Sequence, residues 1–203
     1  FDDFLSELRS KKRSNIKRER RRFHDNGGRT KVLWVDEVTD EHLRRMFRYY
    51  RRTVMKYFGG SQYLNEAFYL RLGETMRDRL HLVVTEQDGE EFGGAFNVTK
   101  GDRLYGRYWG AMEDVGFAHF EACFYSSIEW CIDRGMSVFE GGSGGDHKFD
   151  RGFMPTYTYS GHYIRHPALK DAIRDFVDRE CQTIERRAEA LWEDSPFKEH
   201  DSG

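Results

Sequence analysis

The spacing of apolar residues divides the chain into helical and extended segments. Apolar side chains about four residues apart predict helices over residues 39–56, 62–78 and 117–134. A sparser apolar stripe among basic residues predicts a helix over 2–24, and His166-Pro167 opens a last helix that runs to about Trp192. Short apolar or alternating runs predict strands at residues 32–35, 80–84, 92–98, 104–111, 137–140 and 157–164.

Turn and cap residues connect these elements into a fold. Asp88-Gly89 and Gly101-Asp102 are turn signals, so residues 80–111 are expected to form an antiparallel meander of three strands. Thr39 is the expected N-cap of the helix that follows it, with His42 at the position where a capping box has Glu. This order of elements predicts an α/β or α+β fold with a mixed sheet.

The charge is unevenly distributed along the chain. Residues 1–31 hold eleven Lys/Arg against five Asp/Glu, a net charge of +6, whereas the whole chain carries −2. We therefore divide the chain into a basic N-terminal helical segment (1–30), a main domain (31–194) and a tail (195–203). The basic run at residues 9–22 suggests contact with a polyanion such as RNA. The alternative is a solvated basic helix that packs across the domain.

Other features narrow the class of protein. No apolar run approaches the roughly 20 residues that a membrane span needs. Cys123, Cys131 and Cys181 lack metal-ligand spacing and fit reduced thiols, so we expect a cytoplasmic protein without a bound metal. The chain starts at Phe1 rather than Met, which suggests a fragment or a trimmed chain.

A glycine-rich loop at residues 140–153 is the strongest candidate for a functional site. It follows a predicted strand and contains Gly141, Gly142, Gly144 and Gly145, then Asp146, His147, Lys148, Asp150 and Arg151. Glycine lets backbone N–H groups approach an anion closely, and the titratable side chains favour polar chemistry. The alternative is a flexible surface loop.

Motifs in chain order then point to a family. They are Phe1–Leu5, Lys12–Arg20, Leu104–Gly110, His119–Tyr125, His147 with Lys148, Arg151–Pro155 and Ser195–Lys198. Together they resemble the C-terminal half of the FemAB-like family of GNAT-type N-acyltransferases, labelled peptidoglycan biosynthesis/recognition. The resemblance implies a GNAT-like fold and transfer of an acyl or aminoacyl group to an amine acceptor, either a small molecule or a peptidoglycan precursor. It also implies acyl-CoA or aminoacyl-tRNA as donor, and the N-terminal half of the parent protein as partner.

Acyl transfer to an amine needs a base, a bound carbonyl and donors for the developing oxyanion. We take His147 as the base, with Glu140 and Glu121 as carboxylate alternatives, and the four glycines of the loop as backbone donors. Lys148 and Arg151 are candidates for binding phosphate or carboxylate. Strand alternation predicts that Tyr105, Arg107 and Trp109 share one face and line the substrate cleft with His119. A structural alternative pairs Glu121 with Arg107 as a buried ion pair.

The sequence leaves open which acyl donor is used and whether the chain is an enzyme. The acidic loop at residues 113–116 would repel a pyrophosphate and argues against CoA, whereas the basic run at 9–22 favours tRNA. A second hypothesis is a catalytically silent half-domain that recognises a cell-wall precursor or RNA. A third is a scaffold half that completes a partner domain, for which an exposed apolar patch would be the sign.

Overall fold

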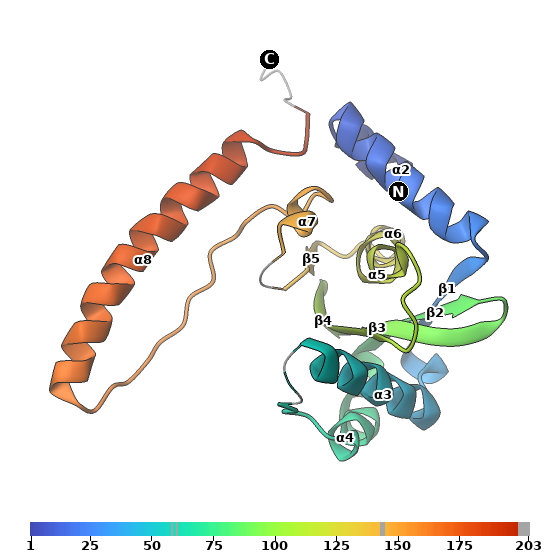
Figure 1. Cartoon of the computed structure of the whole chain (residues 1–203), viewed down its shortest axis with the longest axis horizontal. Helices are drawn as coiled ribbons and strands as arrows, with labels where there is room; N and C mark the ends of the chain where they lie inside the picture. Colours follow the sequence, from blue (N-terminus) through green and yellow to red (C-terminus); the bar gives the residue numbers. More distant parts are fainter. Residues whose placement is uncertain (58, 60, 143–144, 199–203) are drawn as a thin grey trace.

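The computed structural model describes residues 1–57, 59, 61–142 and 145–198, and it is built on one five-stranded sheet (Figure 1). The strands are β1 (Gly28–Trp34), β2 (Leu80–Gln87), β3 (Glu90–Lys100), β4 (Arg103–Ala111) and β5 (Val138–Glu140). They lie in the order β1-β2-β3-β4-β5, with antiparallel pairs from β1 to β4 and a parallel β4–β5 pair. The predicted meander and the mixed α/β fold are therefore confirmed.

Helices cover both faces of this sheet (Figure 1). One face carries α3 (Asp40–Tyr57) and α4 (Glu66–Met76), whose apolar side chains form a core with β2 and β3. The other face carries a continuous helix made of α5 (Ala118–Phe120), the π-helical segment η3 (Glu121–Tyr125) and α6 (Ser126–Asp133). Above that helix lie α1 (Asp2–Glu7) and α2 (Ser10–Asp25), which bury Leu5 and Ile16 against Phe124. The basic segment 1–30 thus packs across the domain, and its division as a separate unit stays a prediction.

The predicted cap of α3 is present. The backbone N–H of Thr39 donates to Nδ1 of His42 at 3.1 Å, and the N–H of His42 is 3.4 Å from Oγ1 of Thr39. His42 therefore takes the part that Glu has in a capping box. Short 3₁₀ turns, η1 (Val35–Glu37) and η2 (Arg77–Arg79), connect β1 to α3 and α4 to β2.

Three predicted elements differ from the structure. The first helix is broken at Leu8, which is extended and bridges to Phe197, while the N–H of Arg9 donates to Pro196 O at 2.9 Å. The helix expected from residue 62 begins at Glu66, because Asn65 caps it through the N–H of Phe68. The strand expected at 157–164 is wrong: these residues form no strand, because no described strand lies beside them to accept their hydrogen bonds.

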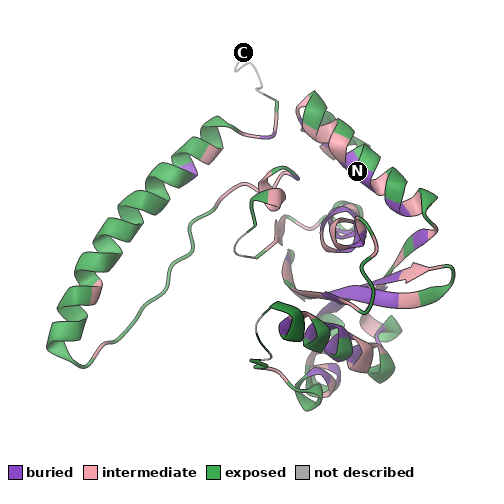
Figure 2. Ribbon diagram, in the orientation of Figure 1, coloured by how far each residue is buried: buried purple, intermediate pink, exposed green. Residues whose placement is uncertain are grey.

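From about residue 154, the chain after β5 leaves the body of the molecule (Figure 1). A short helix, α7 (Asp146–Phe149), is followed by residues 154–166 without regular structure and then by the predicted last helix, α8 (Pro167–Glu193). From residue 156 to the end of α8, almost every residue is exposed (Figure 2). Among the described residues, no helix combines the length and apolar character required to cross a membrane.

Candidate active site

The candidate site lies where β4 and β5 separate. The two parallel strands pair only over Arg103–Val138, Leu104–Phe139 and Tyr105–Glu140. β5 ends at Glu140, and beyond Tyr105 no described strand pairs with the edge of β4 that faced β5. Backbone groups freed from a ladder need another partner, such as water or a bound ligand. The end of this pairing therefore leaves a polar cleft between β4 and β5, at one end of the sheet.

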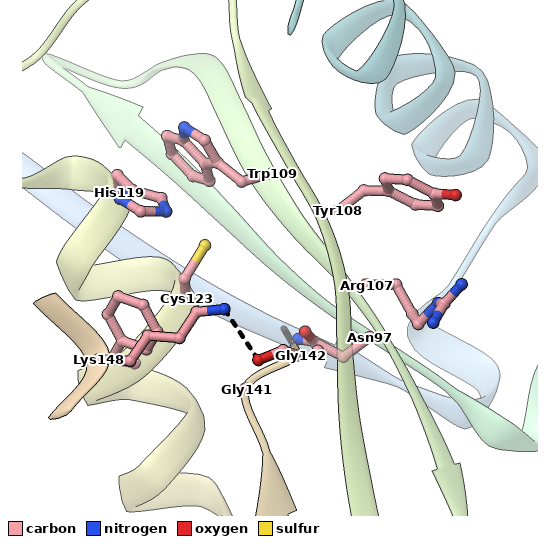
Figure 3. Close-up of a pocket in the computed structure, with 11 residues that line it drawn as sticks. Asn97, Arg107, Tyr108, Trp109, His119, Cys123, Gly141, Gly142 and Lys148 are labelled. Carbon is pink, nitrogen blue, oxygen red and sulfur yellow. Dashed lines mark hydrogen bonds between the residues drawn. The ribbon is translucent and has the colours of Figure 1, made fainter. Parts of the chain in front are cut away.

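A pocket of about 280 Å³ occupies this cleft. Its walls come from β3, β4, the α5–η3 helix and the glycine loop, and they comprise Asn97, Gly106, Arg107, Tyr108, Trp109, His119, Cys123, Phe124, Gly141, Gly142 and Lys148. In Figure 3, Trp109, His119, Cys123 and Lys148 gather on one side of β4, where they face a common space. The part of the wall that the model describes includes cations, an imidazole and a thiol, but no carboxylate.

A β-bulge in β4 changes which side chains face this pocket. Asn97 pairs with Gly106 and Phe96 pairs with Tyr108, so Arg107 is an extra residue. As a result Leu104 packs against Trp130, and Trp109 packs against Ala122, on the same side of the sheet. The prediction that Tyr105, Arg107 and Trp109 share one face is therefore wrong. Arg107 is exposed, stacks on Tyr108 at 5.8 Å and extends away from His119 and Lys148 (Figure 3).

The helix opposite β4 is also irregular at the pocket. Residues 121–125 form a π-helical turn, a feature that is often found at functional sites. Ser126 and Ser127 secure it: Ser126 Oγ donates to Oε1 of Glu121 at 3.2 Å, and Ser127 Oγ donates to the carbonyl of Ala122 at 3.0 Å. This turn carries Cys123 and Phe124 into the pocket wall.

Two histidines lie side by side at the site. The rings of His119 and His147 are 5.6 Å apart, and the ring of His119 is also 5.6 Å from that of Trp109. Burial, followed by the positive charges of His147, Arg151 and Lys148, lowers the pKa of His119 to about 4. Burial and the charges of Arg151 and Lys148 also lower the pKa of His147. His119 is consequently neutral near pH 7 and has a nitrogen lone pair for a hydrogen bond.

Lys148 brings an ammonium group to the glycine loop. Its Nζ donates to the carbonyl of Gly142 at 3.1 Å (Figure 3). Partial burial lowers its pKa. Burial also raises the pKa of the Cys123 thiol, although the charge of Lys148 opposes that shift, so the thiol is protonated at neutral pH. The cation is therefore the group here that is suited to hold an anion or a developing oxyanion.

A buried charge network holds α7 in place. Arg151 donates to Oε2 of Glu19 at 2.6 Å, to the hydroxyl of Tyr125 at 2.7 Å and to the carbonyl of His147 at 2.6 Å. Tyr125 also donates to Glu19. The guanidinium lies 3.6 Å from the centre of the Phe120 ring. Arg151, predicted to bind substrate, instead ties α2 and η3 to the turn that carries His147 and Lys148.

The two carboxylate candidates are engaged elsewhere. Glu121 is fully buried, and both its oxygens accept from Arg20, at 2.9–3.2 Å. The alternative that paired it with Arg107 is therefore wrong, because the basic N-terminal helix supplies its partner. Glu140 lies on β5, half exposed, with an oxygen 3.5 Å from Arg103. Neither carboxylate lines the pocket.

The structure describes three of the four glycines that were predicted as backbone donors. Gly141 and Gly142 line the pocket, and Gly142 and Gly145 have positive φ of 75° and 88°. Such backbone favours glycine, and a Cβ on Gly145 would also lie 2.6 Å from the His147 ring. Gly144 lies outside the described residues. Within those residues, no cluster of three or more His, Cys, Asp or Glu side chains is arranged to hold a metal.

Sequence reasoning missed several residues of the site. Cys123 is one helical turn after His119, so their shared face was a usable signal. Glu19 lies between Ile16 and Phe23 on the buried stripe of α2, and an acid in such a stripe needs a buried cation. Asn97 had no comparable signal, because its place in the pocket depends on the bulge opposite it.

A mixed sheet that opens over a pocket of cationic and imidazole side chains defines an α/β protein with a cleft suited to polar group transfer. The chain matches the model of the FemAB-like family, described as peptidoglycan biosynthesis/recognition, over residues 1–199. It belongs to this family, and the resemblance seen in the sequence is confirmed. No curated protein matches the chain.

Several solved structures resemble it in part. L-PGS from Bacillus licheniformis matches with a TM-score of 0.48 and 14% identity over 66% of this chain and 43% of that chain. An aminoglycoside acetyltransferase from an uncultured soil metagenomic sample matches with a TM-score of 0.46 and 11% identity over 70% and 97%. An aminoglycoside N-acetyltransferase in complex with CoA matches with a TM-score of 0.44 and 13% identity over 69% and 97%. The match spans less than half of the first of these proteins.

Proposed function

We propose that this chain is a GNAT-type N-acyltransferase that moves an acyl or aminoacyl group to an amine, with a peptidoglycan precursor as the acceptor class. The observation that carries the proposal is the pocket between β4 and β5, where Lys148 and His119 face the freed backbone edge of β4. Membership of the FemAB-like family supports this reaction class.

The pocket contains the groups that the reaction needs. The acceptor ammonium must lose a proton, and the neutral imidazole of His119 can accept a hydrogen bond from it, with His147 beside it toward solvent. As the amine attacks the carbonyl carbon, the oxygen becomes negative. In this proposal Lys148, which lines the pocket, and the backbone N–H groups of β4 and of Gly141–Gly142 stabilise that charge. We propose His147 with His119 as the bases, Glu121 as the counter-ion of Arg20, and Glu140 as a carboxylate at the entrance.

The donor class follows from the same chemistry. Either an acyl-CoA thioester or the ester of an aminoacyl-tRNA presents a carbonyl carbon with a good leaving group. We propose one of these two as donor, and the N-terminal half of the parent protein as a partner that completes the substrate site.

A transfer assay tests the proposal. The chain is incubated with labelled acetyl-CoA, or with labelled aminoacyl-tRNA, and with an amine-bearing peptidoglycan precursor peptide. We expect transfer by the wild type and a fall in kcat/KM of about 100-fold for His147→Ala and for His119→Ala. His162→Ala, on the exposed segment after α7, is the matched control and should keep full activity. If both site variants transferred at the wild-type rate, the assignment of the bases would be wrong.

The outer face of α2 favours a second candidate function, the binding of RNA. Among the described residues, no ion pair is formed by the α2 cations Lys11, Arg13, Lys17, Arg18, Arg21 and Arg22, and most of them are exposed. Such a row of cations binds phosphates and releases counterions.

The test is binding of tRNA at several salt concentrations. The double variant Arg18→Gln with Arg21→Gln should bind tRNA more weakly. The slope of log affinity against log salt should also become shallower, by the amount expected for the loss of about two phosphate contacts. Arg174→Gln with Arg186→Gln on α8 is the charge-matched control. Equal binding by both double variants would remove α2 as the RNA site.

A further inference from the structure

Residues 154–193 form an arm that makes few contacts with its own domain, among them the exposed ion pair of Arg187 with Asp146. The arm consists of the extended segment 154–166 and α8, and we call it the arm below. Both of its ends are fixed to the body: Phe153 stacks on Phe139 at 5.1 Å, and Phe197 bridges to Leu8. Between these anchors nearly every residue is exposed (Figure 2).

The extended part of the arm has the pattern of a β-strand. Tyr157, Tyr159 and Tyr163 lie two or four residues apart, so they share one side of an extended chain. They are 51%, 92% and 91% exposed. Polar Thr, Ser and His residues occupy the positions between them. A segment with this period usually lies in a sheet, with its N–H and C=O groups paired to a neighbour.

The helix of the arm has an apolar stripe that is also uncovered. Leu169, Ile173, Phe176, Val177, Ile184, Ala188 and Leu191 follow helical spacing over the 27 residues of α8. Of these, Ala188 is buried, whereas Phe176, Val177 and Ile184 are 54%, 42% and 49% exposed. At about 1.5 Å per residue the stripe from Leu169 to Leu191 is about 33 Å long. Helical stability in proteins comes mainly from burial of such a face.

The sheet has an open edge that matches this arm. β5 is the last strand in the order of the sheet, and no described strand pairs with its outer edge. An unpaired strand-like segment and an unpaired edge therefore occur in the same chain, joined by residues 141–153. Exchange of such an element between identical chains satisfies both at once. Exposed edges are also the usual template for strand addition.

We propose that the arm is an exchange element that docks on a second copy of this chain. The segment 154–166 adds to the outer edge of β5 of the partner, and α8 lays its apolar stripe over the same region. A symmetric pair made in this way covers both arms and both open edges. The inference is independent of the proposed function, because none of the arm residues lines the pocket.

The test is the molar mass of the whole chain in solution, measured by light scattering during size exclusion at several concentrations. We expect a mass of two chains for the wild type. Ile184→Asp puts a charge into the stripe and should shift the sample to monomer, with at least tenfold weaker association. Gln182→Asp puts the same charge on the opposite face of α8 and should leave the dimer intact. Tyr159→Pro removes a backbone donor from the extended segment and should also weaken the dimer.

Thermal unfolding and near-UV circular dichroism show whether each variant still has a folded body. A wild-type chain that is monomeric at all concentrations would overturn the proposal, even if it bound a separately produced domain. A dimer that persists equally in Ile184→Asp and Tyr159→Pro would also overturn it, because the arm would then not be the interface.

Discussion

Phe47 in the body and Phe176 on the arm have similar places in their helices, yet their environments are opposite. Each lies within the apolar stripe of an amphipathic helix, Phe47 on α3 and Phe176 on α8. Phe47 is 9% exposed in the core of the body, and Phe176 is 54% exposed on the arm. The tyrosines Tyr69 and Tyr159 differ in the same way, at 0% and 92%. An apolar pattern thus determines the kind of element and its buried face, but not what covers that face.

The largest expected difference between body and arm concerns buried charge. Arg151→Met leaves Glu19 buried without its cation, since the two side chains are only 6% and 11% exposed. Loss of one partner of a buried pair costs about 3–5 kcal/mol. The free energy of unfolding, measured with urea, should fall by that order. Arg187→Met breaks the exposed pair of Arg187 on α8 with Asp146 and should cause no measurable change. Equal effects would mean that the charge network does not hold the body together.

The next expected difference between body and arm is the effect of replacing a glycine by alanine. A Cβ on Gly110 would lie 2.1 Å from the carbonyl oxygen of Tyr49, so β4 and α3 would have to move apart. Overpacking of this kind costs about 1–3 kcal/mol and sometimes more. Gly110→Ala should therefore lower the midpoint of urea unfolding. Gly161→Ala on the arm, where no atom lies within 4 Å of the new Cβ, should leave that midpoint unchanged. A normal midpoint for Gly110→Ala would contradict the close packing of α3 on β4.

A smaller expected difference concerns how the stability of histidine variants of the body and of the arm depends on pH. Burial lowers the pKa of His81 to about 3. Between pH about 6.5 and 3 the unfolded chain therefore binds a proton that the folded chain does not, and stability falls as the pH falls. One such group contributes a slope of up to about 1.4 kcal/mol per pH unit. His81→Gln should make the slope shallower by about that amount, whereas His162→Gln on the exposed arm should not. An unchanged slope for His81→Gln would show that this histidine titrates normally.

Most elements of the body could be predicted from the sequence, but only some residues of the candidate site could. Local signals sufficed where the partner was close in the chain, as for Thr39 and His42 at the start of α3. They failed at Arg107, because one bulged residue reverses the alternation of β4 from that point. They also failed for Glu121, whose partner Arg20 is 101 residues away on another helix. Patterns report the neighbours of a residue in its own element, whereas a site depends on elements that meet in space.

The arm also shows that a local pattern does not reveal what an element packs against. Its helix was predicted well, as His166-Pro167 at the start and the stripe along it indicated. Residues 157–164 do not form the predicted strand, since a strand requires a neighbour and none of the described strands lies beside them. The exposed apolar arm motivates the proposed exchange with a second copy, whereas the hypothesis of a half that completes a partner domain stays a prediction.

The most direct test of the central claim, acyl transfer at the pocket between β4 and β5, is a comparison of two lysine variants. Lys148 lines that pocket, and Lys170 lies exposed on α8. The measurement is the rate at which the whole chain moves a labelled acyl group from acetyl-CoA or aminoacyl-tRNA to an amine of a peptidoglycan precursor. The account predicts transfer by the wild type and by Lys170→Met, and a rate about 100-fold lower for Lys148→Met, as expected for loss of an oxyanion donor. No transfer from either donor by the wild type, or equal rates for the two variants, would contradict it.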